Sequence, residues 1–337
     1  MKRWSTREVA RLAGVSPATV SRVLNQRTSV TPDLAAKVRA VVRSLDQEGA
    51  GQGRTGSVRK VGVAFPRRLQ GYDTDPTGGV FYGQVLGGVD DVLHEGGHEH
   101  SLFPYDPDGP ARELVSRQMA RFDGMILVGA DTTDELAREA ARRNLPVIVV
   151  DKQVRGVDSV VSDNAGGAEE ATAHVLAQGY RHLAYLCETF ADPSFAARRR
   201  GFECAVEQSG LQDVTMHVAE LGRGWLDAPG ILADLFNAPE RPLGVVAGND
   251  MTALHILAVA RARGLSIPDD IGLAGFDDVA LASRSDPPLT TVRVDKAEMG
   301  RLAARRLLER IGSPDLLPIT ITMHIALTVR GSTHLRR

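Results

Sequence analysis

The segment Ser5–Gln26, STREVARLAGVSPATVSRVLNQ, decides how the amino-terminal part of this 337-residue chain folds. Ser5 and Glu8 have the spacing of a capping box, which predicts that a helix begins here. Its buried face would carry Val9, Leu12 and Ala13. Gly14 can adopt the left-handed turn that ends such a helix.

A second short helix follows after a turn of only two residues, Gly14 and Val15. Ser16 caps it, and Pro17 occupies the first helical position, where the missing N–H costs nothing. Its buried face would carry Val20, Val23 and Leu24. Two short capped helices around a tight turn predict a helix-turn-helix, whose second helix enters the DNA major groove. That helix would expose Ala18, Ser21 and Arg22, and an arginine is the usual reader of guanine.

A third helix is predicted from Thr31-Pro32 onward. Apolar residues recur at helical spacing within it, at Leu34, Val38, Val41, Val42 and Leu45. We therefore expect an all-α DNA-binding domain over residues 1–46. Residues 47–60 are rich in glycine and polar residues, as in a linker.

The formal net charge of −2 conceals a strong asymmetry along the chain. Residues 1–60 hold 12 Lys and Arg against 4 Asp and Glu, so the remainder is acidic. A basic head on an acidic body suits a module that binds a polyanion, although a solvated basic face would have the same composition.

The overall composition, 43% apolar and 24% charged, is that of a globular chain long enough for two or three packed units. Two cysteines, Cys187 and Cys204, are too few for a disulfide framework and favour a reducing compartment. No apolar run approaches the roughly 20 residues that a membrane helix needs, and the polar first residues lack a signal-peptide core. We expect a cytoplasmic protein without a membrane partner.

Beyond residue 60, short apolar runs alternate with amphipathic helical stretches, which predicts parallel sheets. The expected strands are 61–65, 125–128, 147–150, 160–161, 183–186, 244–247 and 271–274. The expected helices are 82–94, 134–143, 166–178, 197–209 and 251–263. More than 270 residues of this pattern exceed one typical domain, so we expect two α/β units with a cleft between them.

The segment Ser5–Gln26 resembles the amino-terminal signature of the lactose-repressor (LacI/GalR) family of bacterial transcription regulators. Further segments resemble the family in order and spacing: DGMILVGAD (123–131), LPVIVVD (145–151), VVSDNAGGAEEATAHVLAQGYRHLAYL (160–186), RRRGFECAVEQSGL (198–211), VVAGNDMTALHILAVARARGLSIPDDIGLAGFDD (245–278) and PPLTTVRVDKAEMGRLAARRLL (287–308). The resemblance covers nearly the whole chain. It implies a helix-turn-helix head, a hinge, and a core of two Rossmann-like lobes similar to periplasmic sugar-binding proteins.

By this resemblance the ligand-binding and dimerisation core spans 61–337. One lobe would comprise about 61–160 and 293–320, and the other about 161–292 and 321–332, with the chain crossing between lobes three times. The hinge at 47–60 departs from the family, whose members usually carry a Pro-Asn segment and a leucine that wedges into the minor groove. Here the hinge is glycine-rich and lacks leucine, so we expect weaker or differently shaped DNA bending, with Arg54 a candidate for the minor groove.

In the head, the resemblance assigns Ser16, Pro17, Ala18 and Arg22 to the major groove, and Thr6, Thr19, Ser21 and Asn25 to phosphates. The alternative for Ser16 and Thr19 is that they only cap and pack.

In the cleft, resemblance and chemistry indicate the same ligand-binding residues: Phe81, Tyr82, Asp151, Arg198, Trp225, Asn249 and Asp277. The fork of Arg198 suits two oxygens, and Asn249 and Asp277 follow strands, where ligands of α/β proteins bind. Trp225 offers a flat apolar face, and Phe81 or Tyr82 would form the opposite wall. Together they favour a neutral, polyhydroxylated ligand such as a carbohydrate. The structural alternative is that Trp225 packs in the core, the acids cap turns, and Arg198 pairs with an acid on its own helix.

Three sequence patterns suggest other chemistry, but each lacks the secondary structure or the partner residues that this chemistry requires. Gly51, Gly53 and Gly56 spell GxGxxG, but they follow a helix and precede a strand, the reverse of a dinucleotide loop. His94 and His98 match HExxH, but Gly96 and Gly97 between them disfavour the continuous helix that zinc requires. Asp277-Asp278 has no accompanying nucleophile or base motif. We expect no enzyme activity, metal or cofactor.

These observations predict a sequence-specific repressor whose affinity for a near-palindromic operator is controlled by a small ligand between the lobes. A homodimer is expected over a tetramer because no leucine heptads follow the last strand. One rival is a sugar sensor whose head has lost specific DNA recognition, and the atypical hinge supports it. The other is a nucleotide or metal enzyme, supported only by the patterns above.

Overall fold

The computed structural model describes residues 6–16, 19–20, 23, 34, 37–38, 41, 58–66, 76–105, 121–129, 134–239 and 241–335. The chain divides into a smaller unit, Met1–Val58, and a larger unit, Arg59–Arg337. Among the helices of the described ranges, none is long and apolar enough to cross a membrane.

The smaller unit begins with helix α1 (Thr6–Ala13), which buries Val9 and Ala13 as the spacing predicts. Leu12, predicted on the same face, is instead 47% exposed. The reason is that Ala10 is buried, so the buried stripe is centred on the side of Val9 away from Leu12.

The predicted turn and second cap are confirmed in this unit. Gly14 has φ +64°, and the Thr19 amide donates a 3.1 Å hydrogen bond to the Ser16 Oγ. Val20, Val23 and Val38 are buried in one cluster with α1, whereas Leu34, part of the predicted apolar repeat, is 37% exposed. The residues that the structure does not describe include Pro17, Ala18, Ser21, Arg22, Leu24, Asn25, the start of the third helix and most of the linker with Arg54.

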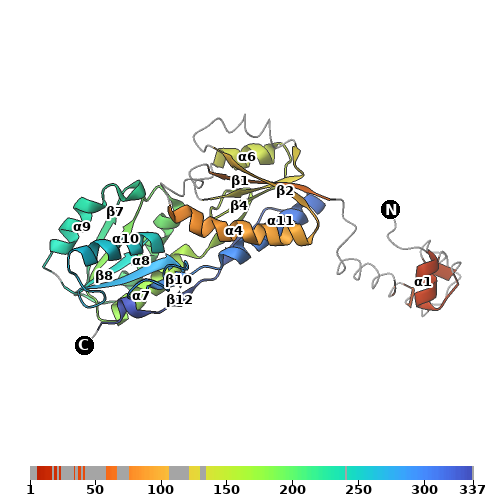
Figure 1. The fold of residues 1–337 in the computed structure, drawn as a ribbon. Helices are drawn as coiled ribbons and strands as arrows, with labels where there is room; N and C mark the ends of the chain where they lie inside the picture. The colour runs from red at the N-terminus through yellow and green to blue at the C-terminus, as the bar shows by residue number, and fades with distance from the viewer. Residues whose placement is uncertain are drawn as a thin grey trace. The chain divides into compact units, whose positions relative to one another are not determined.

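The larger unit contains two six-stranded sheets (Figure 1). The first has the order β11-β5-β4-β3-β1-β2, and its pairings are parallel. Its strands are β1 (Lys60–Pro66), β2 (Glu99–Tyr105), β3 (Gly124–Val128), β4 (Val147–Val150), β5 (Asp158–Ser162) and β11 (Thr320–Met323).

The second sheet has the order β12-β10-β9-β8-β6-β7, and only the pair β10/β12 is antiparallel. Its strands are β6 (His182–Cys187), β7 (Thr215–Glu220), β8 (Leu243–Ala247), β9 (Ile271–Asp277), β10 (Thr290–Arg293) and β12 (Ala326–Thr328). Each of the strands expected from an apolar run is present in one of the two sheets.

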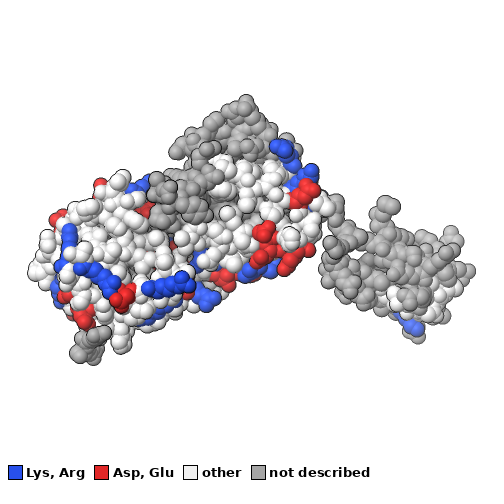
Figure 2. Space-filling view, viewed as in Figure 1, with Lys and Arg blue, Asp and Glu red and all other residues white. Residues whose placement is uncertain are grey.

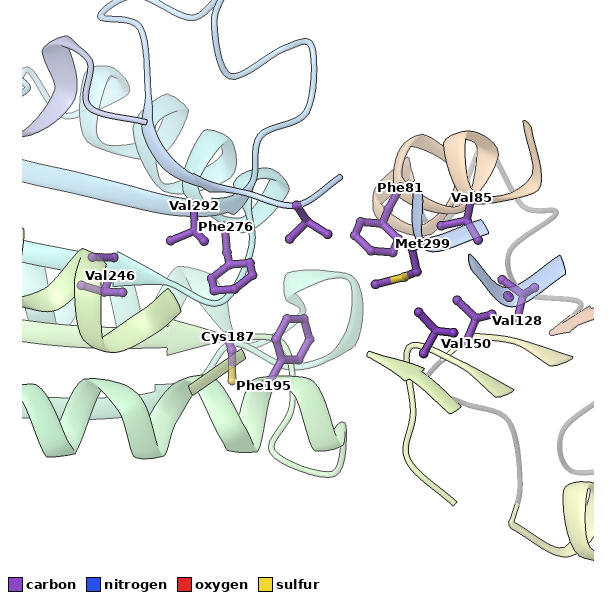
Figure 3. Packing of buried hydrophobic residues seen from close by; sticks show 14 of the residues in the cluster. Phe81, Val85, Val128, Val150, Cys187, Phe195, Val246, Phe276, Val292 and Met299 are labelled. Atoms are coloured by element: carbon purple, nitrogen blue, oxygen red, sulfur yellow. The ribbon is translucent and has the colours of Figure 1, made fainter. Parts of the chain in front are cut away.

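Helices pack on both sheets. We call the first sheet with α4 (Pro76–Glu95), α6 (Asp134–Arg142) and α11 (Lys296–Gly312) the first lobe. The second lobe is the second sheet with α7 (Asn164–Ala177), α8 (Pro193–Gln208), α9 (Ala228–Asn237) and α10 (Asp250–Ala262). One apolar cluster, containing Phe81 and Met299 from the first lobe and Phe195 and Phe276 from the second, joins the lobes (Figure 3).

The chain passes between the sheets three times, after β5, after β10 and after β11. The first sheet takes in residues as far as Ser162 and Met323, slightly beyond the limits of 160 and 320 expected from the sequence. These passages bring the carboxyl ends of strands from both lobes toward a shared region.

Several elements have no apolar run that would predict them. The strands β2 and β7 lie at sheet edges and carry exposed polar residues, so their sequences do not alternate clearly. The helix α11 interleaves arginines with its buried Met299, Ala303 and Leu307, which hides its apolar stripe.

Helices α4 and α11 lie side by side in the first lobe (Figure 1). They approach closely because glycines line their contact. A Cβ atom on Gly88 would lie 1.9 Å from the Ala297 carbonyl oxygen, and one on Gly300 would lie 2.0 Å from that of Val85. The neighbouring Gly87 has open space instead.

We expect Gly88→Ala to lower the free energy of unfolding of the core by about 1–3 kcal/mol, because the two helices must separate. Gly87→Ala is the matched control, and it should raise that free energy by about 0.5–1 kcal/mol through helix propensity. Urea unfolding followed by circular dichroism measures both. Equal effects of the two substitutions would contradict the close approach.

Candidate functional site

Three predicted ligand residues lie at the carboxyl ends of strands. Asp151 follows β4 of the first lobe, while Asn249 and Asp277 lie at the ends of β8 and β9 in the second. Arg198 lies on α8, one turn beyond the helix start at Pro193. Such strand ends are where open α/β sheets bind ligands.

Arg198 is 5% exposed and is held by three elements of the second lobe. Its Nε donates to the Asn164 Oδ1 at 2.8 Å, its Nη1 to the Gly248 carbonyl at 2.6 Å, and its Nη2 to the Asp277 Oδ1 at 3.4 Å. The guanidinium carbon lies 3.7 Å from the centroid of the Phe276 ring. The acid that pairs with Arg198 therefore comes from β9 and not from its own helix.

Asp277 has φ +108°, a conformation that non-glycine residues rarely adopt. Burial raises the pKa of its carboxyl to about 6, against the opposing charges of Arg198 and Lys296. The Lys296 ammonium, at the start of α11, donates to the Asp277 carbonyl and to that of Val294 at 3.1 Å. This lysine thus links the first lobe to the carboxyl end of β9 in the second.

Asp250 is fully buried beside this group, although no sequence pattern indicated it. Its Oδ2 accepts a hydrogen bond from the Val279 amide at 2.8 Å, and its Oδ1 accepts one from the Thr291 hydroxyl. Burial, followed by the charge of Asp277, raises the pKa of Asp250 to about 8. A carboxyl so enclosed holds β9 and β10 together.

Asp151 presents a buried acceptor. Tyr82 donates a 2.6 Å hydrogen bond to its Oδ2, while its Oδ1 is buried without a hydrogen-bond partner among the described residues. Burial, and then the charge of Asp192, raises the pKa of Asp151 to about 7. Asp192 caps α8 in the second lobe, so acids of both lobes act on one another here.

The predicted aromatic residues differ in their surroundings. The Trp225 ring stacks on His255 at 4.6 Å, and its Nε1 donates to the Thr252 hydroxyl at 3.4 Å. Phe81 is only 7% exposed and lies in the apolar cluster between the lobes, edge-on to Tyr82 at 5.0 Å (Figure 3). Tyr82 is half-buried and reaches Asp151, which makes it the more accessible of the pair.

Asn249 also has a structural role. Its Oδ1 accepts a 2.8 Å hydrogen bond from the Thr252 amide and so caps α10. This bond occupies its carbonyl oxygen, so the amide nitrogen is the part of Asn249 that remains a candidate ligand donor.

The residues that sequence reasoning missed are Asn164, Asp192, Asp250 and Lys296. Asp192-Pro193 is a recognisable cap before a helix, but its position opposite Asp151 depends on how the lobes pack. A lysine in a charged helix gives no signal that it is buried, because burial is set by the partner lobe.

Two of the three competing patterns can be compared with the structure, because Gly51, Gly53 and Gly56 lie outside the described residues. Helix α4 ends at Glu95, and Gly97 has φ +67°, so His94 and His98 do not share a helix face. The His98 Nδ1 instead accepts a 3.3 Å hydrogen bond from the Arg59 amide. Asp278 pairs with Arg330 at 2.6 Å. In the part of the chain that is described, no group of three His, Cys, Asp or Glu side chains could hold a metal ion.

In the head, Ser16 and Thr19 contact each other through their hydroxyls at 2.9 Å, and Thr6 is the first residue of α1. The other predicted DNA contacts lie outside the described residues. On the face of the core seen in Figure 2, acidic and basic side chains lie next to one another, so the described surface there shows no field of a single sign.

Asp151 predicts a specific pH dependence of stability. Because its folded pKa is raised to about 7, the protonated form stabilises the fold at low pH, and this contribution is lost as pH rises from about 4 to 7. Relative to the wild type, the free energy of unfolding of Asp151→Asn should therefore rise by roughly 2–4 kcal/mol across that range. Unfolding at several pH values measures the difference, and Asp213→Asn at an exposed acid is the control. A difference that stays constant with pH for Asp151→Asn would contradict the burial of its charge.

Comparison with known proteins adds independent findings. The description "Bacterial regulatory proteins, lacI family" matches residues 5–47, and "Periplasmic binding protein-like domain" matches residues 172–333. The ribose operon repressor of Escherichia coli (strain K12) is 29% identical, with 97% of this chain and 98% of that protein covered. The transcriptional repressor PurR of Vibrio campbellii (strain ATCC BAA-1116) is 28% identical, with 97% of each covered.

Solved structures agree over nearly the whole chain. The transcriptional regulator CelR–cellobiose complex has a TM-score of 0.70 at 25% identity, with 98% of this chain and 100% of that chain covered. The lac repressor dimer bound to operator and the anti-inducer ONPF has a TM-score of 0.68 at 22% identity, with 99% and 100% covered, which supports the fold alone. The head signature, the two Rossmann-like lobes and these comparisons together show a lacI-family regulatory domain at residues 5–47, followed by a core with a periplasmic-binding-protein-like domain at residues 172–333, as in the LacI-type repressors to which the chain is similar.

Proposed function

We propose that this chain is a sequence-specific transcriptional repressor whose operator affinity is controlled by a small ligand bound between the two lobes. Residues 1–46 would read the operator, 47–60 would link head and core, and 61–337 would bind ligand and dimerise. The observation that carries the proposal is the buried group of Arg198, Asp277 and Asp151, which gathers donors and acceptors from both lobes in a chain whose amino-terminal segment carries a helix-turn-helix signature.

On the DNA side, the second head helix supplies Pro17, Ala18 and Arg22 to the major groove. Thr6, Thr19, Ser21 and Asn25 would contact phosphates. A symmetric dimer places two such helices about one helical turn apart, so the operator would be near-palindromic.

On the ligand side, the group favours neutral hydroxyls. Asp151 and Asp277 offer acceptors, and Arg198 offers donors. Arg198 and Asp277 pair with each other, and burial raises the pKa of Asp151 to about 7, so the group carries little net charge. The buried Asp151 Oδ1 in particular needs a donor, which a ligand hydroxyl supplies. Trp225 presents an aromatic face for the apolar side of a sugar ring. A carbohydrate effector agrees with two of the similar proteins, the ribose operon repressor and the CelR–cellobiose complex.

The control mechanism follows from the position of the site. A ligand that contacts Asp151 in one lobe and Arg198 and Asp277 in the other favours one arrangement of the lobes over another. The Lys296 bond to the Asp277 carbonyl carries that preference into α11 and the first lobe, from which the linker leads to the head. The coupling free energy would be about 1–3 kcal/mol and acts equally in both directions.

We expect repeated selection from a random duplex library at near-physiological salt to enrich a palindrome. Arg22→Ala should then lose about 1–3 kcal/mol of discrimination against a changed base in the half-site. Binding that stays unspecific and salt-sensitive would instead favour the rival interpretation, a sensor whose glycine-rich linker no longer supports operator recognition.

The ligand site is tested by calorimetry with D-ribose and cellobiose. At least one sugar should bind, and Arg198→Lys should weaken it by about 10- to 100-fold, since lysine cannot bond Asn164, Gly248 and Asp277 together. Arg199→Lys is the matched control, because the adjacent Arg199 forms an ion pair with Glu203 on its own helix and lies over the Phe190 ring, with no contact to the Arg198 partners among the described residues. Binding that is insensitive to Arg198→Lys would place the ligand elsewhere.

A further inference from the structure

The carboxyl of Asp151 is buried at the end of β4, where the first lobe meets the second. Its Oδ2 accepts the 2.6 Å hydrogen bond from the neutral Tyr82 hydroxyl of α4. Its Oδ1 is buried without a hydrogen-bond partner among the described residues. A negative charge on this carboxyl would therefore keep much of the cost of leaving water.

The cations near Asp151 are bonded to other groups. Arg198 directs its nitrogens to an amide oxygen of α7, a carbonyl at the end of β8 and the carboxylate of Asp277. Lys152, the next residue in the chain, forms a 3.1 Å ion pair with an acid of α6. Lys296, at the start of α11, donates to two backbone carbonyls. The hydrogen bond that reaches Asp151 thus comes from a tyrosine and not from a cation.

Negative charge acts on Asp151 from the second lobe. Asp192 caps α8 there, and its Oδ1 accepts hydrogen bonds from the Ser194 amide at 2.7 Å and the Phe195 amide at 3.4 Å. The amino-terminal end of a helix favours a negative charge on such a cap. Two carboxyl groups that act on one another in a buried place resist being ionised together, so a proton on Asp151 relieves their repulsion.

Ionisation of Asp151 falls within the range of physiological pH. Burial, followed by the charge of Asp192, raises the pKa of its carboxyl to about 7, and the charge of Asp277 acts in the same direction. The hydrogen bond from Tyr82 and the charge of Arg198 oppose this rise of the pKa. A modest change of pH therefore changes the charge at the boundary between the lobes.

We propose that the contact between the lobes at Asp151 is a pH-sensitive switch. The neutral carboxyl lets the lobes pack together, whereas the ionised carboxyl repels Asp192 and gains water when the lobes separate. The apolar cluster that joins the lobes has no titratable group, so it opposes separation equally at every pH. Because Asp151 is also a proposed effector contact, the consequence for the operator rests on the proposed function, and pH would be a second input to it.

The switch is tested on the full chain without sugar or DNA. Cys204→Ser leaves the buried Cys187 as the remaining cysteine. Spin labels are then attached through Glu135→Cys on α6 and Glu207→Cys on α8, at two exposed positions in different lobes. Pulsed dipolar electron paramagnetic resonance between pH 5 and 8 measures the distance between the labels, with labelled chains diluted in unlabelled protein.

The ratio of separated to closed lobes should rise about tenfold or more from pH 5 to 7 and level off above pH 7. The reason is that separation returns the pKa of Asp151 from about 7 toward its ordinary value, so closure is favoured on the acidic side. An unchanged distance distribution over this range would overturn the proposal. Sugar and operator binding are measured separately, so their failure would contradict the proposed function and not the switch.

Three substitutions identify the titrating group. Asp151→Asn keeps the side chain neutral and should remove the pH dependence. Tyr82→Phe removes the donor to the carboxylate and should move the rise to higher pH. Asp192→Asn can still cap α8 but lacks the charge, so the rise should level off at a lower pH than in the wild type.

Asp213→Asn is the matched control, at an exposed acid that pairs with Arg181, and it should keep the wild-type curve. A rise that persists in Asp151→Asn would mean that another acid titrates, and it would overturn the proposal. If Asp151→Asn fails to fold, the opposite shifts of Tyr82→Phe and Asp192→Asn decide, because shifts in one direction or none would equally overturn it. Melting temperatures confirm that each variant is folded.

Discussion

The arrangement of the proposed ligand site depends on the interactions of the buried guanidinium of Arg198. It joins α7 through Asn164, the end of β8 through Gly248, and the end of β9 through Asp277, and it stacks on Phe276. A charge removed from water needs partners on every side, so these elements must meet in one arrangement. The same requirement leaves the strand ends lined with acids whose pKa values are raised by burial.

The second constraint is the contact between the two lobes at the start of α11. Helix α11 belongs to the first lobe and packs closely against α4 through Gly88 and Gly300, yet its first residue, Lys296, bonds to the Asp277 carbonyl of the second lobe. The apolar cluster between the lobes buries surface, and such burial does not require one particular orientation of the lobes. The hydrogen bond of Lys296 and the acids around it do require a fixed geometry. In the proposed function, a ligand that changed this group would act directly on α11.

Much of the fold could be predicted from the chain because its signals are local. The apolar runs of β3, β4 and β8 are buried on both faces, and a parallel strand so placed reads as a continuous apolar segment. Leu12 and Leu34 show the limit of such patterns, since each lies on a predicted apolar face and is exposed. The sequence does not predict the edge strands β2 and β7, because each pairs with a neighbouring strand along only one edge and keeps exposed polar residues.

The sequence by itself determined the head motif with its caps at Gly14 and Ser16, the alternation of strands and helices, and most of the candidate ligand residues. Each of these depends on neighbours within a few positions along the chain. Only the tertiary structure decided that Arg198 pairs with Asp277 and that Lys296 and Asp250 are buried. The physical reason is that desolvation and charge pairing are set by residues far apart in sequence, which come together only when the two lobes pack.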